Sequence, residues 1–203
     1  MADAADKREQ LREERRRQIL GAALTVFSKK GFHAANVSDV AAEAGVSQGT
    51  IYWYFDSKDD LLKAALLHFF ADFGEVTLDA LEHCQSAAEK LQALGQSMEL
   101  FVKDAEGLFT LFLSYWSSSS QREEAGRWWI DLLVEYKDIL VGIIEEGVRN
   151  GEFRPVDAEP LVWALMAAYD GLAAYLVLMP DIDLKRVNQA FIGTLLNGLL
   201  MES

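Results

Sequence analysis

The sequence predicts an all-α protein of about nine helices, with a small N-terminal helical domain followed by a larger one. Only three of its 203 residues are proline, and 51% are hydrophobic against 25% charged, as in an ordinary globular protein with a buried core. Ala, Leu and Glu, which favour helices, are abundant, and apolar residues recur at helical spacing along most of the chain. These observations favour long helices over a β-rich fold.

The first predicted element is a helix over residues 9–30. Its apolar positions recur every three or four residues, and Gly31 provides a C-terminal stop. A basic run from Arg12 to Arg17 lies in its first half. Two interpretations of that run stay open at this point. It lies along a phosphate backbone, or it is simply a solvated helix face.

A short helix and a tight turn follow. Asn36 can cap a helix that runs to about Ala44, because Asp39 lies three residues later, near the positive end of the helix dipole. Gly45 then permits a tight turn, and the Ser47 hydroxyl can cap the next helix. This arrangement predicts a helix-turn-helix.

The third predicted helix covers residues 48–55 and is only two turns long. One small apolar cluster is predicted from Val37, Val40, Ala41, Ala44, Val46, Ile51 and Phe55. Outside it we expect Gln48, Gly49, Thr50, Tyr52, Trp53 and Tyr54. So short a helix gains little from folding unless its exposed aromatic face meets a partner, and a DNA major groove accepts such a helix. The alternative is that the aromatic side chains pack against the first or fourth helix.

The remaining helices are longer. Ser57 can cap a fourth helix that runs to about Leu81 and connects the two domains. Five further helices are predicted at residues 87–104, 106–118, 122–149, 157–178 and 183–201, separated by Gly, Ser or Pro. The predicted domains are residues 9–56 and residues 57–203.

The net charge of −13 argues at first against nucleic-acid binding. The distribution of the charge changes that inference. Residues 7–60 contain nine Lys and Arg against eight Asp and Glu, whereas residues 61–203 contain ten against twenty-two. The acidity therefore belongs to the C-terminal domain, and the N-terminal domain is close to neutral.

Several classes of protein are excluded or disfavoured. The single cysteine, Cys84, rules out an intramolecular disulfide and fits a reducing, cytoplasmic environment. The histidines, His33, His68 and His83, do not form a metal-ligand set, so we expect no metal, cofactor or catalytic residue. The polar residues 1–17 lack a signal peptide, and we expect no membrane span because no uninterrupted apolar run approaches about 20 residues.

The N-terminal motifs resemble those of the TetR family of transcriptional regulators. The matching residues are Phe27, Gly31-Phe32, Val37-Ser38-Asp39-Val40-Ala41, Ala44-Gly45-Val46-Ser47, Gly49-Thr50-Ile51-Tyr52, Tyr54-Phe55 and Ser57-Lys58. They stand in the family's order and spacing over about 50 residues, whereas the C-terminal domain is similar only in general plan. The resemblance implies a DNA-binding domain followed by an effector-binding and dimerisation domain.

The resemblance also implies residue roles in DNA binding. Gln48, Tyr52 and Trp53 would face bases, and Ser38, Ser47, Thr50, Tyr54 and Lys58 would hold phosphates. The chemistry agrees in part, because Gln can pair bidentately with adenine, an aromatic face can pack on a thymine methyl, and hydroxyl groups suit phosphate oxygens. The family often has a basic residue where this chain has Gln48, which leaves its base preference open.

An effector cavity among the C-terminal helices is implied in the same way. The predicted contacts are Trp116, Trp128, Tyr169 and Asp170, although aromatic residues at helical spacing also fill ordinary cores. An unpaired carboxylate at position 170, within the apolar stretch 161–179, would be costly to bury. It either accepts hydrogen bonds from a neighbouring helix or meets a polar or cationic effector.

The last two predicted helices carry apolar residues on several faces, which suggests association. The resemblance implies a homodimer packed through these helices and a palindromic double-stranded DNA operator. The function that follows is a ligand-responsive regulator, favoured as a repressor that a small, largely apolar effector releases from DNA. An activator is the alternative within this class. Outside it, the alternatives are an enzyme that uses the helical pocket and a helical interaction module without DNA.

Overall fold

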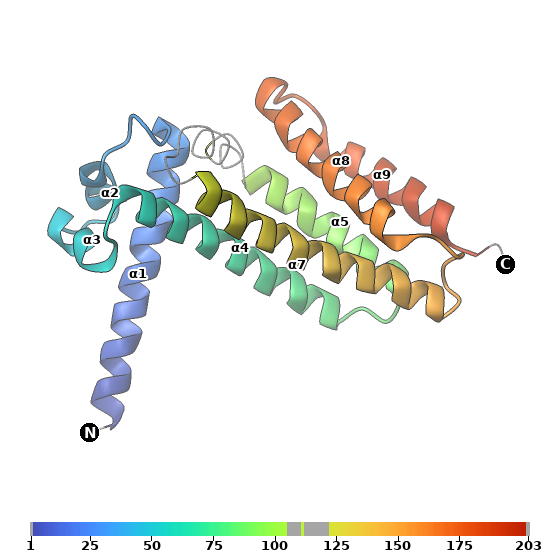
Figure 1. Ribbon diagram of the computed structural model, residues 1–203, viewed down its shortest axis with the longest axis horizontal. Helices are drawn as coiled ribbons and strands as arrows, with labels where there is room; N and C mark the ends of the chain where they lie inside the picture. Colours follow the sequence, from blue (N-terminus) through green and yellow to red (C-terminus); the bar gives the residue numbers. More distant parts are fainter. Residues whose placement is uncertain (1, 105–110, 112–121, 202–203) are drawn as a thin grey trace. The chain divides into compact units, whose positions relative to one another are not determined.

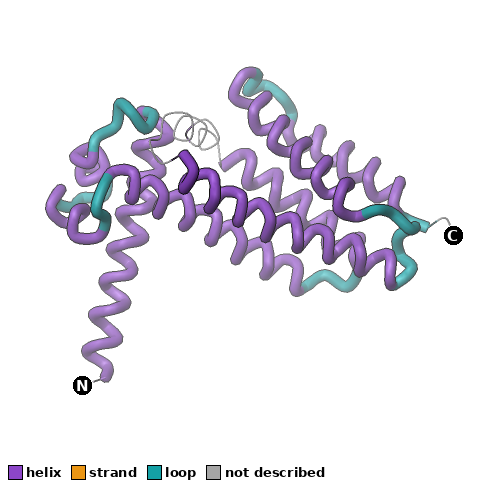
Figure 2. The backbone as a smooth tube through the Cα atoms, viewed as in Figure 1, coloured by secondary structure: helices purple, strands orange, loops and turns teal. Residues whose placement is uncertain are grey.

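The computed structural model describes residues 2–104, 111 and 122–201, without the side chains of residues 2–6, 103, 104, 122–125 and 128. Its helices are α1 (Ala2–Lys30), α2 (Val37–Glu43), α3 (Gln48–Tyr54), α4 (Lys58–Glu82), α5 (Ala87–Asp104), α7 (Arg122–Arg149), α8 (Ala158–Leu178) and α9 (Leu184–Leu199) (Figure 1). Every regular element in these ranges is a helix (Figure 2). Within the same ranges, Phe153 and Leu200 form an isolated antiparallel β-bridge.

The all-α prediction is confirmed, and the helix ends lie within a few residues of those expected. The largest difference is at α1, which begins at Ala2 rather than near Glu9. The helix predicted over residues 106–118 lies outside the described residues. The described chain forms two compact units, one up to Phe73 together with Leu111 and the other from Gly74 onward. Helix α4 begins in the first unit and ends in the second.

Local hydrogen bonds explain the short second helix and the turn after it. The backbone N–H of Asn36 donates to Asp39 Oδ2 at 3.0 Å, and Lys30 Nζ lies 2.8 Å from Asp39 Oδ1. These two contacts lower the pKa of Asp39, because both stabilise the carboxylate; the bond to Lys30 has the larger effect. Gly45 has a φ of +62°, and the Val46 N–H donates to the Ala41 carbonyl at 3.0 Å.

A small core holds the first three helices together. It is formed by Ile19, Leu20, Ala23, Val26 and Phe27 of α1 with Val37, Val40, Ala41, Ala44, Ile51 and Phe55. All the members of the predicted apolar cluster are therefore buried except Val46, which is half-buried. Burial of these side chains is what positions α3, since a two-turn helix has little stability of its own.

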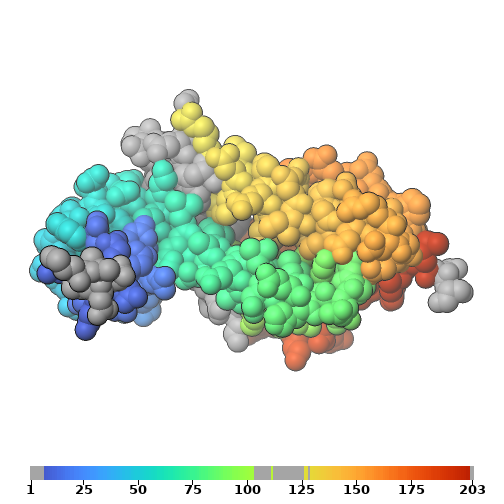
Figure 3. All heavy atoms as spheres, turned by 90° about the horizontal axis from the view of Figure 1, so that it is seen from below, coloured from blue at the N-terminus to red at the C-terminus, as the bar shows by residue number. Residues whose placement is uncertain are grey.

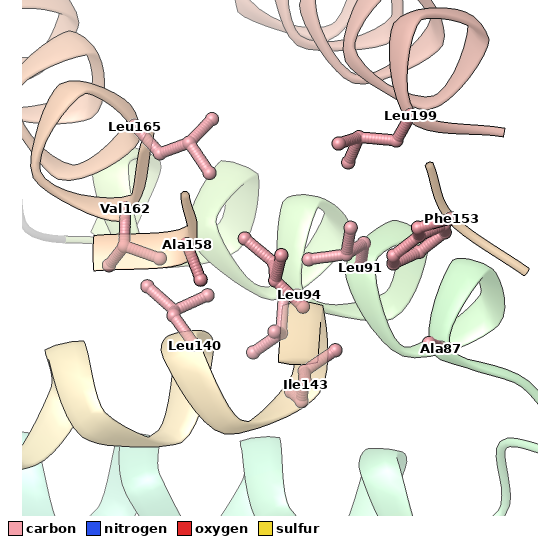
Figure 4. Close-up of a cluster of buried hydrophobic side chains, with 11 residues drawn as sticks. Ala87, Leu91, Leu94, Leu140, Ile143, Phe153, Ala158, Val162, Leu165 and Leu199 are labelled. Atoms are coloured by element: carbon pink, nitrogen blue, oxygen red, sulfur yellow. The ribbon is translucent and has the colours of Figure 1, made fainter. Parts of the chain in front are cut away.

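The second unit has its own core around α5, which contacts α7, α8 and α9. Leu91 and Leu94 of α5 meet Leu140 of α7 and Val162 of α8, and the Phe153 ring fills one end of the cluster (Figure 4). A Cβ atom on Gly147 of α7 would overlap the Phe153 ring. The chain between α7 and α8 can therefore return close to the end of α7 only because residue 147 has no side chain.

Candidate nucleic-acid interface

Helix α3 presents an exposed polar and aromatic face. Its N-cap is Ser47, whose Oγ accepts a hydrogen bond from the Thr50 N–H at 3.1 Å and lies 2.8 Å from Thr50 Oγ1. Gln48 is exposed, as are Tyr52 (51%) and Trp53 (64%). Because residues four apart lie above one another on a helix, Gln48 and Tyr52 share a side of α3 that Trp53 extends. This face is available to a partner.

The aromatic residue that follows lies on the other side of α3. Tyr54 is half-buried, and its hydroxyl donates to the backbone carbonyl of Arg12 at 3.2 Å. Tyr54 therefore stays outside the buried apolar cluster, as expected, and the chain supplies a partner for its hydroxyl on α1. The alternative that the aromatic residues contact the first helix holds for Tyr54, and for Trp53 through Arg12, whose guanidinium lies 4.9 Å from the indole centroid.

Two other residues with predicted phosphate contacts lie in the first turns of helices, Ser38 in α2 and Lys58 in α4. Ser38 is exposed in the first turn of α2. Lys58, the first residue of α4, is half-buried; its Nζ donates to the Ala35 carbonyl at 2.7 Å and lies 4.4 Å from the Phe32 ring centroid. The Lys58 ammonium group would have to share or leave that carbonyl to reach a phosphate.

Of the residues predicted to contact an effector, the structure describes the side chains of Tyr169 and Asp170. Trp116 and the Trp128 side chain lie outside the described residues. Tyr169 is buried, and its hydroxyl donates to Asn188 Oδ1 at 2.6 Å, while Asn188 Nδ2 donates to the Gly95 carbonyl at 3.0 Å and to Glu99 Oε2 at 3.3 Å. Burial, and secondarily the charge of Glu99, raises the pKa of Tyr169.

Asp170 lies in an apolar stretch of α8, where an unpaired carboxylate would be costly to bury. Its side chain is exposed in the single chain, although it follows the buried Tyr169 on α8. Successive residues of a helix point about 100° apart, so a carboxylate in an apolar stretch can still face outward. Nearby apolar atoms nevertheless exclude enough water to raise its pKa. Within one chain, the Asp170 carboxylate still keeps contact with water.

The second unit buries a polar side chain, Thr77, that the sequence pattern did not predict as a site residue. The Thr77 hydroxyl on α4 is 3% exposed and faces the Tyr136 hydroxyl of α7. Tyr136 of α7, whose hydroxyl donates to the Met98 sulfur of α5 at 3.6 Å, has a pKa raised to about 12 by burial, and Thr77 opposes that rise. No spacing rule links residues 77 and 136, so only the fold brings them together.

Comparison with known proteins covers both units. The family model described as "Bacterial regulatory proteins, tetR family" matches residues 19–65, and "Tetracyclin repressor-like, C-terminal domain" matches residues 84–174. The chain is 30% identical over 138 residues to the fatty acid metabolism regulator protein of Bacillus subtilis (strain 168), covering 68% of this chain and 70% of that protein. It is 30% identical over 162 residues to the HTH-type transcriptional regulator BetI of Escherichia coli (strain K12 / DH10B), covering 78% and 80%.

A solved structure shows the same arrangement of helices. The transcriptional regulator FadR from Bacillus subtilis, in complex with stearoyl-CoA, superimposes with a TM-score of 0.75 at 27% identity. The superposition covers 89% of this chain and 97% of that one. The similarity therefore extends through both the helix-turn-helix unit and the larger helical unit.

Proposed function

Because the chain belongs to the TetR family of bacterial transcriptional regulators, we propose that it is a repressor that binds a palindromic operator as a dimer and is released by a small, largely apolar effector. Family membership makes it a DNA-binding regulator rather than an enzyme. The observation that carries the proposal is the exposed face of α3, where the side chains of Gln48, Tyr52 and Trp53 remain accessible to solvent. Residues 9–56 would read DNA and residues 57–203 would bind the effector and the partner subunit, in the cytoplasm.

In this proposal Gln48, Tyr52 and Trp53 contact base edges in the major groove. The phosphate contacts are Ser38, Ser47, Thr50, Tyr54 and Lys58. Ser47 and Thr50 already bond to each other, so the one hydroxyl proton that this bond leaves free and the N–H groups at the start of α3 would donate to phosphate oxygens. Tyr54 would act mainly by holding α3 against α1, since its hydroxyl is already engaged.

Gel-shift titration with DNA from upstream of the protein's own coding sequence tests DNA reading. Gln48→Ala and Tyr52→Ala should each weaken binding about 5-fold or more, since a good base contact contributes roughly 1–3 kcal/mol. Lys29→Ala, at an exposed position of α1, is the control for substitution as such. Unchanged affinity in both Gln48→Ala and Tyr52→Ala would remove α3 from the interface.

Dimerisation is supported by α8. This helix is apolar and long enough, by length and composition, to cross a membrane, which the sequence-based expectation of no span did not anticipate. Yet only 11% of its most apolar window is buried within one chain, and Leu178 is 76% exposed. In a DNA-binding regulator such a surface is best covered by a second copy of the chain, packed through α8 and α9.

Sedimentation tests this packing. Leu178→Asp should shift the protein from dimer to monomer, because it places a charge in the proposed interface. Val76→Asp, at an exposed apolar position of α4 in the same unit, should leave the dimer intact. A wild-type chain that sediments as a monomer contradicts the proposal.

The proposed effector is apolar with one hydrogen-bonding group. A regulator of similar fold binds stearoyl-CoA, which has an acyl chain and a thioester carbonyl. The buried Thr77 hydroxyl, which faces Tyr136, would donate to such an oxygen. Trp116, Trp128, Tyr169 and Asp170 remain proposed contacts from the sequence.

Tryptophan fluorescence with stearoyl-CoA as the probe tests this. Binding should quench the fluorescence and release DNA in the gel shift. Thr77→Val should weaken binding of the probe, because it removes a buried hydroxyl that would bond to the carbonyl oxygen. If Asp170→Asn leaves the affinity unchanged, Asp170 is not an effector contact.

Regulation would follow from α4, which belongs to both units. An effector bound in the second unit would shift α4 and change the separation of the two recognition helices in the dimer. By linkage, the operator would weaken effector binding by the same factor. An in vitro transcription assay distinguishes a repressor from an activator by the sign of the change when the protein is added.

A further inference from the structure

The first half of α1 is a helix that leaves the core of its own unit. From Ile19 onward one face of α1 is buried, through Ala22, Ala23 and Val26. Before Ile19, every described side chain from Lys7 is exposed except Arg16, which is half-buried. Figure 1 shows this half of the helix extending beyond α2 and α3. Burial of apolar side chains within the unit does not account for this half of α1.

One side of α1 faces the helix-turn-helix. Along that side the residues are apolar from Ile19 onward and cationic before it. Arg8, Arg12 and Arg15 are spaced i, i+4 and i+7, so they lie in one row. Ile19 continues the same spacing four residues after Arg15, which means that the row points to the side on which α1 packs against the helix-turn-helix. We call Arg8, Arg12 and Arg15 the arginine row.

The acidic residues of this segment lie beside the row rather than within it. Glu13 is 3.9 Å from Arg16 Nη1 and 3.7 Å from Arg17 Nε, so it neutralises arginines at the edge and on the far side. Two arginines of the row contact uncharged groups. Arg15 Nη1 donates to Gln18 Oε1 at 2.8 Å, and Arg12 lies over the Trp53 ring. Neither contact cancels a positive charge.

Two contacts join the row to α3. The Arg12 guanidinium lies 4.9 Å from the Trp53 ring centroid, and the Arg12 carbonyl accepts the Tyr54 hydroxyl at 3.2 Å. In Figure 3 the atoms of α1 adjoin those of the α2–α3 region. The row therefore starts at the edge of the proposed base-reading face, and Arg8 stands about 6 Å farther along the helix axis.

We propose that the arginine row is a second DNA-contacting element, which binds the phosphate backbone flanking the bases read by α3. This rests on the proposed function. Duplex DNA is favoured over other partners because the row is cationic, spans about 10 Å and is continuous with the α3 face. Backbone contacts of this kind supply affinity and register without sequence preference. They also show how a chain with a net charge of −13 places cations on DNA.

Hydroxyl-radical footprinting and salt titrations on the upstream DNA fragment test the inference. The row variant is Arg8→Gln with Arg15→Gln; Arg12 is kept because it contacts Trp53. The matched control is Lys7→Gln with Arg17→Gln, which removes the same charge from the same exposed helix segment but from other faces. Circular dichroism and thermal unfolding confirm that both variants stay folded.

The row variant should lose protection only at the outermost sugars of each half-site, with the central protections intact at low salt. The slope of log K against log salt concentration should fall by about 0.9 for each arginine lost from each bound protomer. The control should keep the outer protections. If the row variant and the control have the same footprint and slope, the arginine row is a solvated helix face. If the wild type shows no specific protection at all, the proposed function fails and this inference fails with it.

Discussion

Replacing Tyr169 with Phe removes one hydroxyl from the interior of the second unit. That hydroxyl donates to Asn188 Oδ1 at 2.6 Å, and both side chains are buried, Asn188 to 4% exposure. The Tyr169 ring and its edge contact with Phe191, at 5.7 Å between centroids, would be retained. The substitution therefore isolates the hydrogen bond from the packing.

The expected loss in the free energy of unfolding follows from the Asn188 acceptor that the substitution leaves unpaired. Asn188 Nδ2 keeps its bonds to the Gly95 carbonyl and to Glu99, but Asn188 Oδ1 loses its donor in a place that water does not reach. A buried acceptor left unsatisfied costs about 1–3 kcal/mol. With a urea m-value of about 2 kcal/mol/M, the unfolding midpoint should fall by about 0.5–1.5 M.

Urea unfolding followed by circular dichroism measures this loss. Tyr175→Phe is the control, since Tyr175 lies on the same helix but is exposed, and it should unfold within about 0.5 kcal/mol of the wild type. In an Asn188→Ala background the effect of Tyr169→Phe should shrink, because its partner is gone. Equal losses in the two Tyr→Phe variants, or full additivity with Asn188→Ala, would refute the reasoning.

Two further substitutions test local features of each unit. Gly147→Ala should lower the free energy of unfolding by about 1–3 kcal/mol, because the new methyl group overlaps the Phe153 ring, whereas Gly142→Ala on the same helix meets nothing within 4 Å and should raise it by up to about 1 kcal/mol in denaturant titrations. Asp39→Asn should lower the melting temperature at neutral pH, where the lowered pKa of Asp39 keeps it ionised beside Lys30. That difference should vanish as the pH falls through the folded-state pKa, where the carboxylate is protonated in both states; a difference independent of pH would exclude the ion pair as its cause.

Much of the fold follows from local patterns that need no tertiary information. Asn36, Gly45 and Ser47 end and begin helices through contacts within a few residues, so their roles could be read from spacing. The periodicity of apolar residues also located α5, α7, α8 and α9 to within about two residues. The exposed face of α3 followed in the same way, because a two-turn helix can bury only one side.

The start of α1 was not predictable by this reasoning. The residues before Glu9 have no apolar periodicity, and periodicity was the signal used to place the helix. Ala2–Lys30 is continuous in the structure because a helix, once nucleated, propagates through residues of ordinary propensity. This extra length is what carries Arg8 beyond α3.

The sequence by itself determined the helical class, the caps and turn of the helix-turn-helix, and which α3 side chains face outward, since each depends on residues close together in the chain. Tertiary structure alone decided that Arg12 lies against Trp53, that Tyr169 bonds to Asn188 and that Asp170 points outward. Those outcomes depend on how helices pack across tens of residues. A partner for a given side chain is then set by the angle and register of two helix surfaces, which composition and spacing do not encode.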